Sequence, residues 1–233
     1  MDQMNIGNYF SCPIYSIEKP EWVSKIDKAC DKHIKAAYDR EKPKLKERKK
    51  ELGNKHWNAV KDHGMSYHSG PIEQDPELKE FVDYVGQTAW NLLDGQGFKM
   101  ELYQMFFTEF WVQEFSKNGG GHHDTHVHWD NHISGFYFLK CSDKTSFPVM
   151  HDPRAGAMMT KLPQKDGNKI SPMSDMIHYK PKPGTMIIFP GYVPHEFAVD
   201  PALEPFRFIH WNIKVVETAI SKERSHKDEL QKK

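Results

Sequence analysis

The chain has 233 residues and a mass of 27.2 kDa, the size of one domain or of one domain with a small helical annex. It carries 32 Lys and Arg against 32 Asp and Glu, so its formal charge is zero. This balance excludes a strong overall field of the kind that holds nucleic acids or anionic membranes. The 6 Trp, 9 Tyr and 14 Phe exclude a disordered chain, because they supply the bulk of a folded core.

The cysteine content and the N-terminus indicate where the chain works. Cys12, Cys30 and Cys141 are few, odd in number and widely spaced, so we expect neither a disulfide framework nor a CxxC zinc site. A reducing, cytoplasmic compartment fits this usage. The sequence shows no secretion signal and no stretch of about 18 apolar residues, so we expect no membrane partner.

The N-terminal part of the chain has mainly helical patterns. Residues 8–17 alternate loosely and predict an edge strand, and Pro20 starts a run with apolar residues at a spacing of four. This spacing predicts an amphipathic helix whose apolar face is Trp22, Ile26, Cys30, Ile34 and Tyr38. The basic run from Arg40 to Lys50 contains Pro43 and is typical of a solvated linker or an exposed helix.

A second helix is marked at both ends. Asp75 can cap it, Pro76 suits its first turn, and Gly95 and Gly97 end it. A solvated helix is also expected in the charged C-terminal tail, residues 217–233. The buried face predicted for the second helix is Leu78, Val82, Val85, Ala89 and Leu92.

Strand patterns dominate after Gly97. Residues 101–115 are aromatic and β-branched, and a turn follows at 118–121. Further strands are expected at 133–141, at 179 or 184–189, and at 205–216. The pattern predicts an α+β chain in which a helical and edge-strand support region, residues 1–100, packs on a β-sandwich or barrel core, residues 101–216.

Five histidines lie within eleven residues, directly before a predicted strand. In an extended segment, residues two apart point to the same side, so His126 and His128 would present two imidazoles together. Pairs of His122 with Asp124 or of His128 with Asp130 are open alternatives. Each pair is half of the three-ligand facial site of non-haem iron, and zinc would accept the same residues.

Two further residues stand out in the C-terminal part. His195 follows an apolar strand and a proline-bounded turn, and Arg207 lies twelve residues later. On an extended segment Arg207 shares a face with Ile209 and Trp211, where a guanidinium is costly unless it meets an anion. That anion is either a structural carboxylate or the carboxylate of a bound acid, which arginine can grip with two parallel hydrogen bonds.

Four segments together resemble one family. HVHWDNHISGFYFL (126–139), HDPR (151–154), KPGTMIIFPGYVPHEF (182–197) and FRFIHWN (206–212) are similar to blocks of the Fe(II)/2-oxoglutarate-dependent oxygenases of the prolyl-hydroxylase-like branch. Members in marine bacteria and cyanophages are the most similar, and a phage-encoded protein would work in the host cytoplasm. The resemblance is firm over residues 100–216.

The resemblance implies a double-stranded β-helix, that is, a cupin-like jelly-roll, with an iron site in its mouth. It implies that Fe(II) is held by His126, His128 and His195 and that Arg207 binds the distal carboxylate of 2-oxoglutarate. Such an enzyme consumes O2, converts 2-oxoglutarate to succinate and CO2, and hydroxylates a substrate, here an unidentified small molecule or peptide. The family more often has HxD than HxH, so the pair His128 and Asp130 stays open. Phe138 also stands where a tyrosine that helps bind 2-oxoglutarate is expected.

Two other functions fit the same residues. One is a non-catalytic jelly-roll module that binds a metal or a ligand, and the other is a three-histidine dioxygenase that does not use 2-oxoglutarate. An Arg207 that faces the metal would favour the 2-oxoglutarate-dependent enzyme. We also expect residues 155–176 to form a lid, and His151 and Arg154 either to touch the substrate or to staple their loop.

Overall fold

The computed structural model describes residues 11–159 and 162–218. Its helices are α1 (Val23–Val60), α2 (Lys79–Gly95) and the short α3 (Ala155–Met159), and 3-10 turns precede α1 and α2. The strands are β1 (Tyr15–Glu18), β2 (Ser66–His68), β3 (Tyr103–Phe115), β4 (His123–His126), β5 (Ile133–Lys140), β6 (Pro148–His151), β7 (Met176–His178), β8 (Thr185–Pro190), β9 (His195–Phe197) and β10 (Arg207–Glu217).

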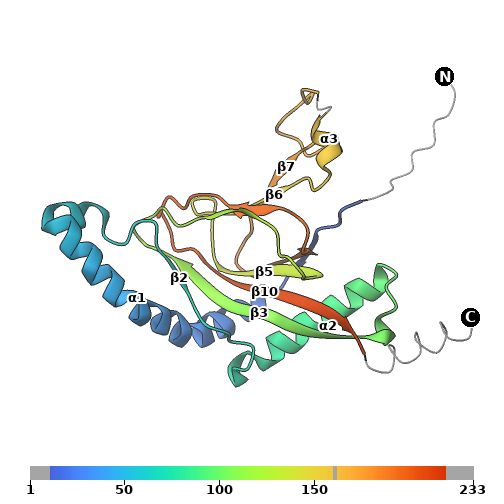
Figure 1. Cartoon of the computed structure of the whole chain (residues 1–233), viewed down its shortest axis with the longest axis horizontal. Helices are drawn as coiled ribbons and strands as arrows, with labels where there is room; N and C mark the ends of the chain where they lie inside the picture. Colours follow the sequence, from blue (N-terminus) through green and yellow to red (C-terminus); the bar gives the residue numbers. More distant parts are fainter. Residues whose placement is uncertain (1–10, 160–161, 219–233) are drawn as a thin grey trace, which may run out of the picture.

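The strands form two antiparallel sheets, and the chain is of the predicted α+β class. The larger sheet has the order β1-β8-β5-β10-β3-β2 and the smaller one β4-β9-β6-β7. Helices α1 and α2 cover one face of the larger sheet, and the smaller sheet lies over the other face (Figure 1). Strands β1 and β2 come from the N-terminal region, yet they pair with β8 and β3 of the core.

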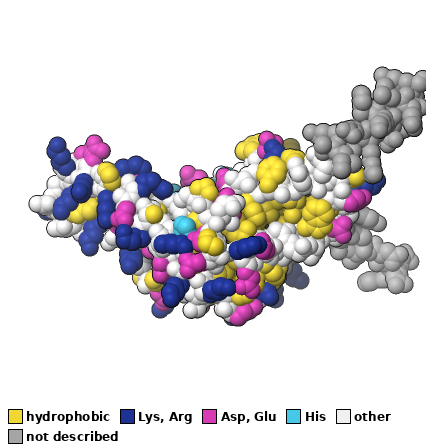
Figure 2. Space-filling model, turned by 90° about the horizontal axis from the view of Figure 1, so that it is seen from below, with side chains coloured by type: hydrophobic (Ala, Val, Ile, Leu, Met, Phe, Trp, Pro, Cys, Tyr) yellow, Lys and Arg dark blue, Asp and Glu magenta, His cyan; other side chains and the backbone are white. Residues whose placement is uncertain are grey.

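The first helix is longer than the predicted apolar stripe. It runs through the basic segment as far as Val60, with Pro43 inside it and a kink at Gly53, whose φ is +68°. Of the two structures considered for residues 40–50, the exposed helix is confirmed. Figure 2 shows Lys and Arg side chains interspersed with acidic ones at the end of the molecule that α1 forms. Pairs such as Lys42 with Asp39 explain how this solvated stretch stays helical.

The helices pack on the larger sheet through one apolar cluster. From α1 it contains Ile26, Cys30 and Ile34, as the spacing of four predicted. Of the face predicted for the second helix, Leu78, Val85 and Ala89 are buried, and Phe81 and Leu93 take the places predicted for Val82 and Leu92. Val82 and Leu92 are only partly buried. The large Phe81 ring accounts for this difference, because it contacts Trp22, Phe110, Tyr137 and Trp211.

A second cluster fills the space between the sheets. It consists largely of phenylalanine rings, among them Phe136 and Phe138 of β5, Phe197 of β9 and Phe208 of β10. Because side chains alternate along a strand, β10 serves both clusters. Ile209, Trp211 and Ile213 pack toward the helices, and Phe208 packs between the sheets.

The strands predicted at 101–115, 133–141, 184–189 and 205–216 are confirmed as β3, β5, β8 and β10. The predicted edge strand is found as β1 from Tyr15, and residues 8–10 lie outside the described residues. The same is true of 219–233 in the predicted tail helix. Strands of three or four residues, namely β2, β4, β6, β7 and β9, were missed because such short runs carry little periodicity. Among the described residues, no helix is both long enough and apolar enough to cross a bilayer.

Candidate metal centre

Three histidines from two distant stretches of the chain meet between the sheets. A nitrogen of His126, one of His128 and one of His195 all lie within 4.8 Å of one another. The ring centroids are 4.5 Å apart for His126 and His195, 4.9 Å for His128 and His195, and 5.1 Å for His126 and His128. Two nitrogens that bind one metal at right angles lie about 3 Å apart. The 3.3 Å between Nε2 of His128 and Nε2 of His195 is close to this value.

Backbone pairing brings the three residues together. In the antiparallel pair of β4 and β9, His126 lies directly opposite His195. His128 follows β4, and its backbone N–H donates to the carbonyl of Gly191, which begins the turn after β8. A Cβ at Gly191 would lie 2.4 Å from the carbonyl oxygen of Asn131, so only glycine permits this approach.

Two of the three rings are oriented by main-chain carbonyls. Nδ1 of His195 donates to the carbonyl of Val193 over 3.0 Å, and Nδ1 of His126 donates to that of Asp124 over 2.7 Å. Each bond leaves Nε2 with a free lone pair. Metal-binding histidines usually donate their second N–H to such an acceptor, so this arrangement fits a bound metal ion.

The surroundings keep His128 and His195 neutral, as metal ligation requires. Burial, and after it the neighbouring imidazoles, lower the pKa of His195 to about 3. Burial likewise lowers the pKa of His128 to about 2, together with the charges that His210 and His195 would carry. Both rings are therefore uncharged at neutral pH, and each has one nitrogen without a hydrogen. Three imidazoles on one side of an ion leave its remaining positions open.

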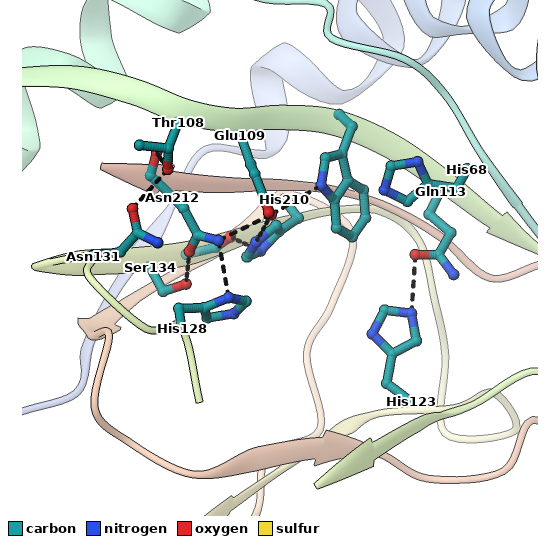
Figure 3. Close-up of polar contacts among 12 residues, drawn as sticks. His68, Thr108, Glu109, Gln113, His123, His128, Asn131, Ser134, His210 and Asn212 are labelled. Atoms are coloured by element: carbon teal, nitrogen blue, oxygen red, sulfur yellow. Dashed lines mark hydrogen bonds and ion pairs between the residues drawn. The ribbon is translucent and has the colours of Figure 1, made fainter. Parts of the chain in front are cut away.

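A network of polar side chains supports His128 from the larger sheet (Figure 3). Nδ2 of Asn212 lies 2.9 Å from Nδ1 of His128 and 3.0 Å from Oε2 of Glu109. His210, which is 1% exposed, stacks on His128, and its Nε2 lies 3.5 Å from Oε2 of Glu109. Glu109, His128 and His210 have the composition of a second metal-binding group. In this second group, Nδ2 of Asn212 already donates to Oε2 of Glu109 and to Nδ1 of His128. We therefore assign the metal to the three histidines.

A pocket of about 500 Å³ opens beside His126 and His128. Trp111 forms part of its wall, with its ring between those of His68 and His210 at centroid distances of 4.0 and 4.6 Å. The residues that line it include neither Lys nor Arg. Its lining residues are His68, Ser69, Gly70, Pro71, Thr108, Glu109, Phe110, Trp111, His123, His126 and His128.

The prediction that Arg207 faces the metal is wrong. Its guanidinium points to the helix side of the larger sheet, as the shared face with Ile209 and Trp211 requires. There it pairs with Glu114 of β3 over 2.7 Å and with Asp27 and Asp31 of α1 over 2.7 and 2.8 Å. The anion that this buried arginine requires is therefore supplied by structural carboxylates.

Other expectations for the site are settled by side-chain direction. Asp130 is 89% exposed and lies 3.5 Å from Lys214, so the pair of His128 and Asp130 is not formed. Asp124 is 98% exposed and lies 3.6 Å from His122, also away from the three histidines. Among the apolar residues of the larger sheet, Phe136 and Phe138 face the space between the sheets, whereas Ile188 and Trp211 face the helices.

Of the two roles considered for Arg154 in the loop after β6, the structure shows the contact within the loop. Arg154 pairs with Asp152 at 2.7 Å, and Asp152 also accepts from the backbone N–H of Arg154. These two contacts hold the loop in its conformation. His151 lies 3.6 Å from Glu196. The expected lid, residues 155–176, begins with α3, and residues 160–161 within it lie outside the described residues.

Several residues around the centre were not predicted from the sequence. Glu109 and Asn212 carry no signal of their own, because single polar residues on long strands are common. His210 is buried directly against His128. The alternation of side chains along a strand could have pointed to His210 and Asn212, because both lie on the face of β10 opposite to Arg207.

Comparison with protein families agrees with this arrangement. Residues 109–202 match the family described as "Putative 2OG-Fe(II) oxygenase". This segment is therefore similar to 2-oxoglutarate-dependent oxygenases. The oxygenase match contains all three histidines and ends before Arg207. No curated protein sequence matches the chain significantly.

Solved structures resemble this chain in fold. EvdO2 from Micromonospora carbonacea var. aurantiaca aligns with a TM-score of 0.52 at 12% identity, covering 94% of this chain and 96% of that one. A prolyl-4-hydroxylase from Pseudomonas putida aligns with a TM-score of 0.50 at 11% identity, covering 88% and 94%. At these identities the likeness concerns the fold alone.

Proposed function

We propose that His126, His128 and His195 hold one Fe(II) ion and that the two sheets around it are a double-stranded β-helix, or jelly-roll. The observation that carries the proposal is the convergence of three imidazoles within 4.8 Å, two of them already oriented by carbonyl oxygens. Three nitrogen ligands on one face leave room on the ion for O2 and an organic ligand.

In the proposed reaction an unidentified small molecule or peptide is hydroxylated while 2-oxoglutarate is converted to succinate and CO2. The bound iron supplies the activation of O2. The chain holds the ion, and the pocket beside it, walled by Trp111 and His68, offers the substrate a place next to the open positions. The phenylalanine cluster below excludes water from the other side.

The residues present do not fit the expected anchor for 2-oxoglutarate. Arg207 is engaged by three carboxylates on the opposite face of the sheet, and the pocket beside the histidines is lined by neither Lys nor Arg. This observation favours a second candidate function, a three-histidine dioxygenase that oxidises its substrate without an oxo acid.

One experiment separates these functions. Purified protein is loaded with Fe(II) under anaerobic conditions, and O2 uptake and succinate are then followed with and without 2-oxoglutarate. Succinate formed in step with O2 uptake supports the 2-oxoglutarate-dependent hydroxylase. Iron bound without turnover of 2-oxoglutarate shifts the assignment to the three-histidine dioxygenase, or to a binding module if no other substrate consumes O2.

Two variants control this experiment. His195→Ala removes the most buried of the three imidazoles and is expected to abolish both iron binding and turnover. His122→Ala removes a half-exposed histidine of the same cluster and is expected to leave both unchanged. Iron binding that survives in His195→Ala contradicts the proposed metal site.

A further inference from the structure

The three imidazoles are not prepared for a metal in the same way. Main-chain carbonyls accept from Nδ1 of His126 and of His195, so both rings carry their hydrogen on Nδ1 and present a lone pair on Nε2. The partner of Nδ1 in His128 is the side-chain amide of Asn212, at 2.9 Å. An amide can offer either a hydrogen or a lone pair, depending on which way it is turned.

The neighbours of Asn212 determine its orientation. Oε2 of Glu109 can only accept, and it lies 3.0 Å from Nδ2 of Asn212. On the other side, the hydroxyl of Ser134 donates to Oδ1 of Asn212. Nδ2 therefore donates one hydrogen to Glu109 and the other to Nδ1 of His128, which satisfies every polar atom of the amide (Figure 3).

This orientation selects the tautomer of His128. Because Nδ1 accepts a hydrogen bond, the hydrogen of the neutral ring is on Nε2. Nε2 lies 3.3 Å from Nε2 of His195, whose lone pair is free to accept it. His128 thus donates toward the place where a metal ion would be bound. In this tautomer it cannot be a ligand through Nε2.

We propose that Glu109 and Asn212 form a tautomer switch that keeps His128 out of the ligating form until a metal ion is taken up. On uptake Nε2 loses its hydrogen, Nδ1 gains one through solvent, and the amide of Asn212 turns by half a turn so that Oδ1 accepts from Nδ1. The turn brings Oδ1 against Oε2 of Glu109, two acceptors in contact. The Glu109 side chain is 48% exposed and can swing into solvent to relieve this contact.

Asn212 and Glu109 are in this account positioning residues, since they act through His128. The part that concerns metal uptake rests on the proposed metal site. The part that concerns the tautomer does not, because it is a property of the metal-free chain.

Nitrogen NMR of histidine-labelled, metal-free protein tests the tautomer directly, with His128→Gln used to assign the signals. We expect the hydrogen on Nε2 in His128 and on Nδ1 in His126 and His195. In Glu109→Gln a side-chain amide can donate to the turned Asn212, so the His128 population should shift toward the Nδ1–H form. A wild-type His128 with its hydrogen on Nδ1 overturns the proposal.

Glu196→Gln is the matched control, because it removes the same charge from the residue next to His195 without touching Asn212. Glu196 instead accepts from Thr125. The control should leave the His128 tautomer unchanged. A shift as large as that of Glu109→Gln would show that charge alone is responsible and would overturn the switch.

The affinity for Zn(II) tests the second part of the proposal, the change of the His128 tautomer on metal uptake. Asn212→Leu leaves Nδ1–H of bound His128 without an acceptor and should weaken Zn(II) binding about ten- to a hundredfold, while Asn212→Asp keeps an acceptor and should stay within about threefold of wild type. Equal affinity of the leucine variant and the wild type contradicts the switch. Wild-type protein that binds no Zn(II) overturns the metal site and the turn on uptake, while the NMR result still decides the tautomer.

Discussion

The guanidinium of Arg207 ties β10 to β3 and to the first helix. It is 4% exposed and meets Glu114, itself buried, together with Asp27 and Asp31. A buried charge without its partner is far more costly than the pair is stabilising. This arginine stabilises the fold by pairing with Glu114, and its removal leaves that carboxylate with only the Tyr38 hydroxyl at 3.2 Å and Lys140 at 4.0 Å.

Arg207→Met is therefore expected to lower the free energy of unfolding by about 3 kcal/mol, since one partner of a buried ionic group is removed. The affinity for Zn(II) should not change, because the side chain faces away from the three histidines. Urea unfolding and a metal titration on the same variant measure the two effects. Arg154→Met, which breaks an exposed pair with Asp152, is the control and should cost less than about 1 kcal/mol.

A loss of metal affinity in Arg207→Met with unchanged stability would contradict this account. It would return Arg207 to the role that the family resemblance suggested. The sequence alone could show that Arg207 needs an anion, from its apolar neighbours. It could not show which face of β10 is turned to the metal, because both faces are buried over most of the strand.

At the scale of elements, β5 and β10 pair so that Gly135 lies opposite Trp211, and residue 135 has no room for a side chain. A Cβ at Gly135 would lie 2.4 Å from the Trp211 ring and 2.8 Å from the backbone oxygen of Ile187. This close contact lets Trp211 fill the space between the sheet and Phe81. The glycine of the SGFYF segment is thus a packing requirement of the sheet.

Gly135→Ala is expected to destabilise the protein by about 3 kcal/mol or more, because backbone and a buried indole must both move. Gly86→Ala is the matched change in α2, where the nearest atom to the new Cβ is 3.9 Å away, and it should stabilise by about 0.5–1 kcal/mol. Thermal unfolding followed by circular dichroism compares them. A Gly135→Ala protein as stable as the wild type would show that the packing described here is wrong.

The long elements could be predicted from the sequence and the short ones could not. The helix from Val23 and the strands β3, β5, β8 and β10 carry enough residues for a period to be visible. Strand β9 has three residues, yet it places His195 opposite His126. Its pairing depends on contacts far apart in sequence. The site could therefore be predicted as a set of histidines but not as a geometry.

At the scale of the whole molecule, neutral buried histidines make stability depend on pH. The pKa of His123 is lowered to about 3, that of His195 to about 3 and that of His128 to about 2, in each case first by burial. In the unfolded chain the pKa of these rings is about 6.5. Between about pH 6.5 and 3 the unfolded chain binds more protons than the folded one, so acid favours unfolding.

The metal-free protein should therefore keep its full stability above about pH 6.5 and lose it as the pH falls, by at most about 1.4 kcal/mol per pH unit for each histidine. Urea midpoints measured between about pH 7.5 and 5 test this. His123→Phe replaces a ring that packs among Phe115, Phe197 and Phe208, so it should flatten the slope. An unchanged slope in this variant would mean that His123 is already charged in the folded state.

X-ray absorption of the Fe(II)-loaded protein, prepared without O2, tests the metal centre most directly. The account predicts three imidazole ligands in the wild type and two in a His126→Ala variant that still retains iron. Fewer than three imidazoles in the wild type, or an unchanged set in the variant, would contradict it.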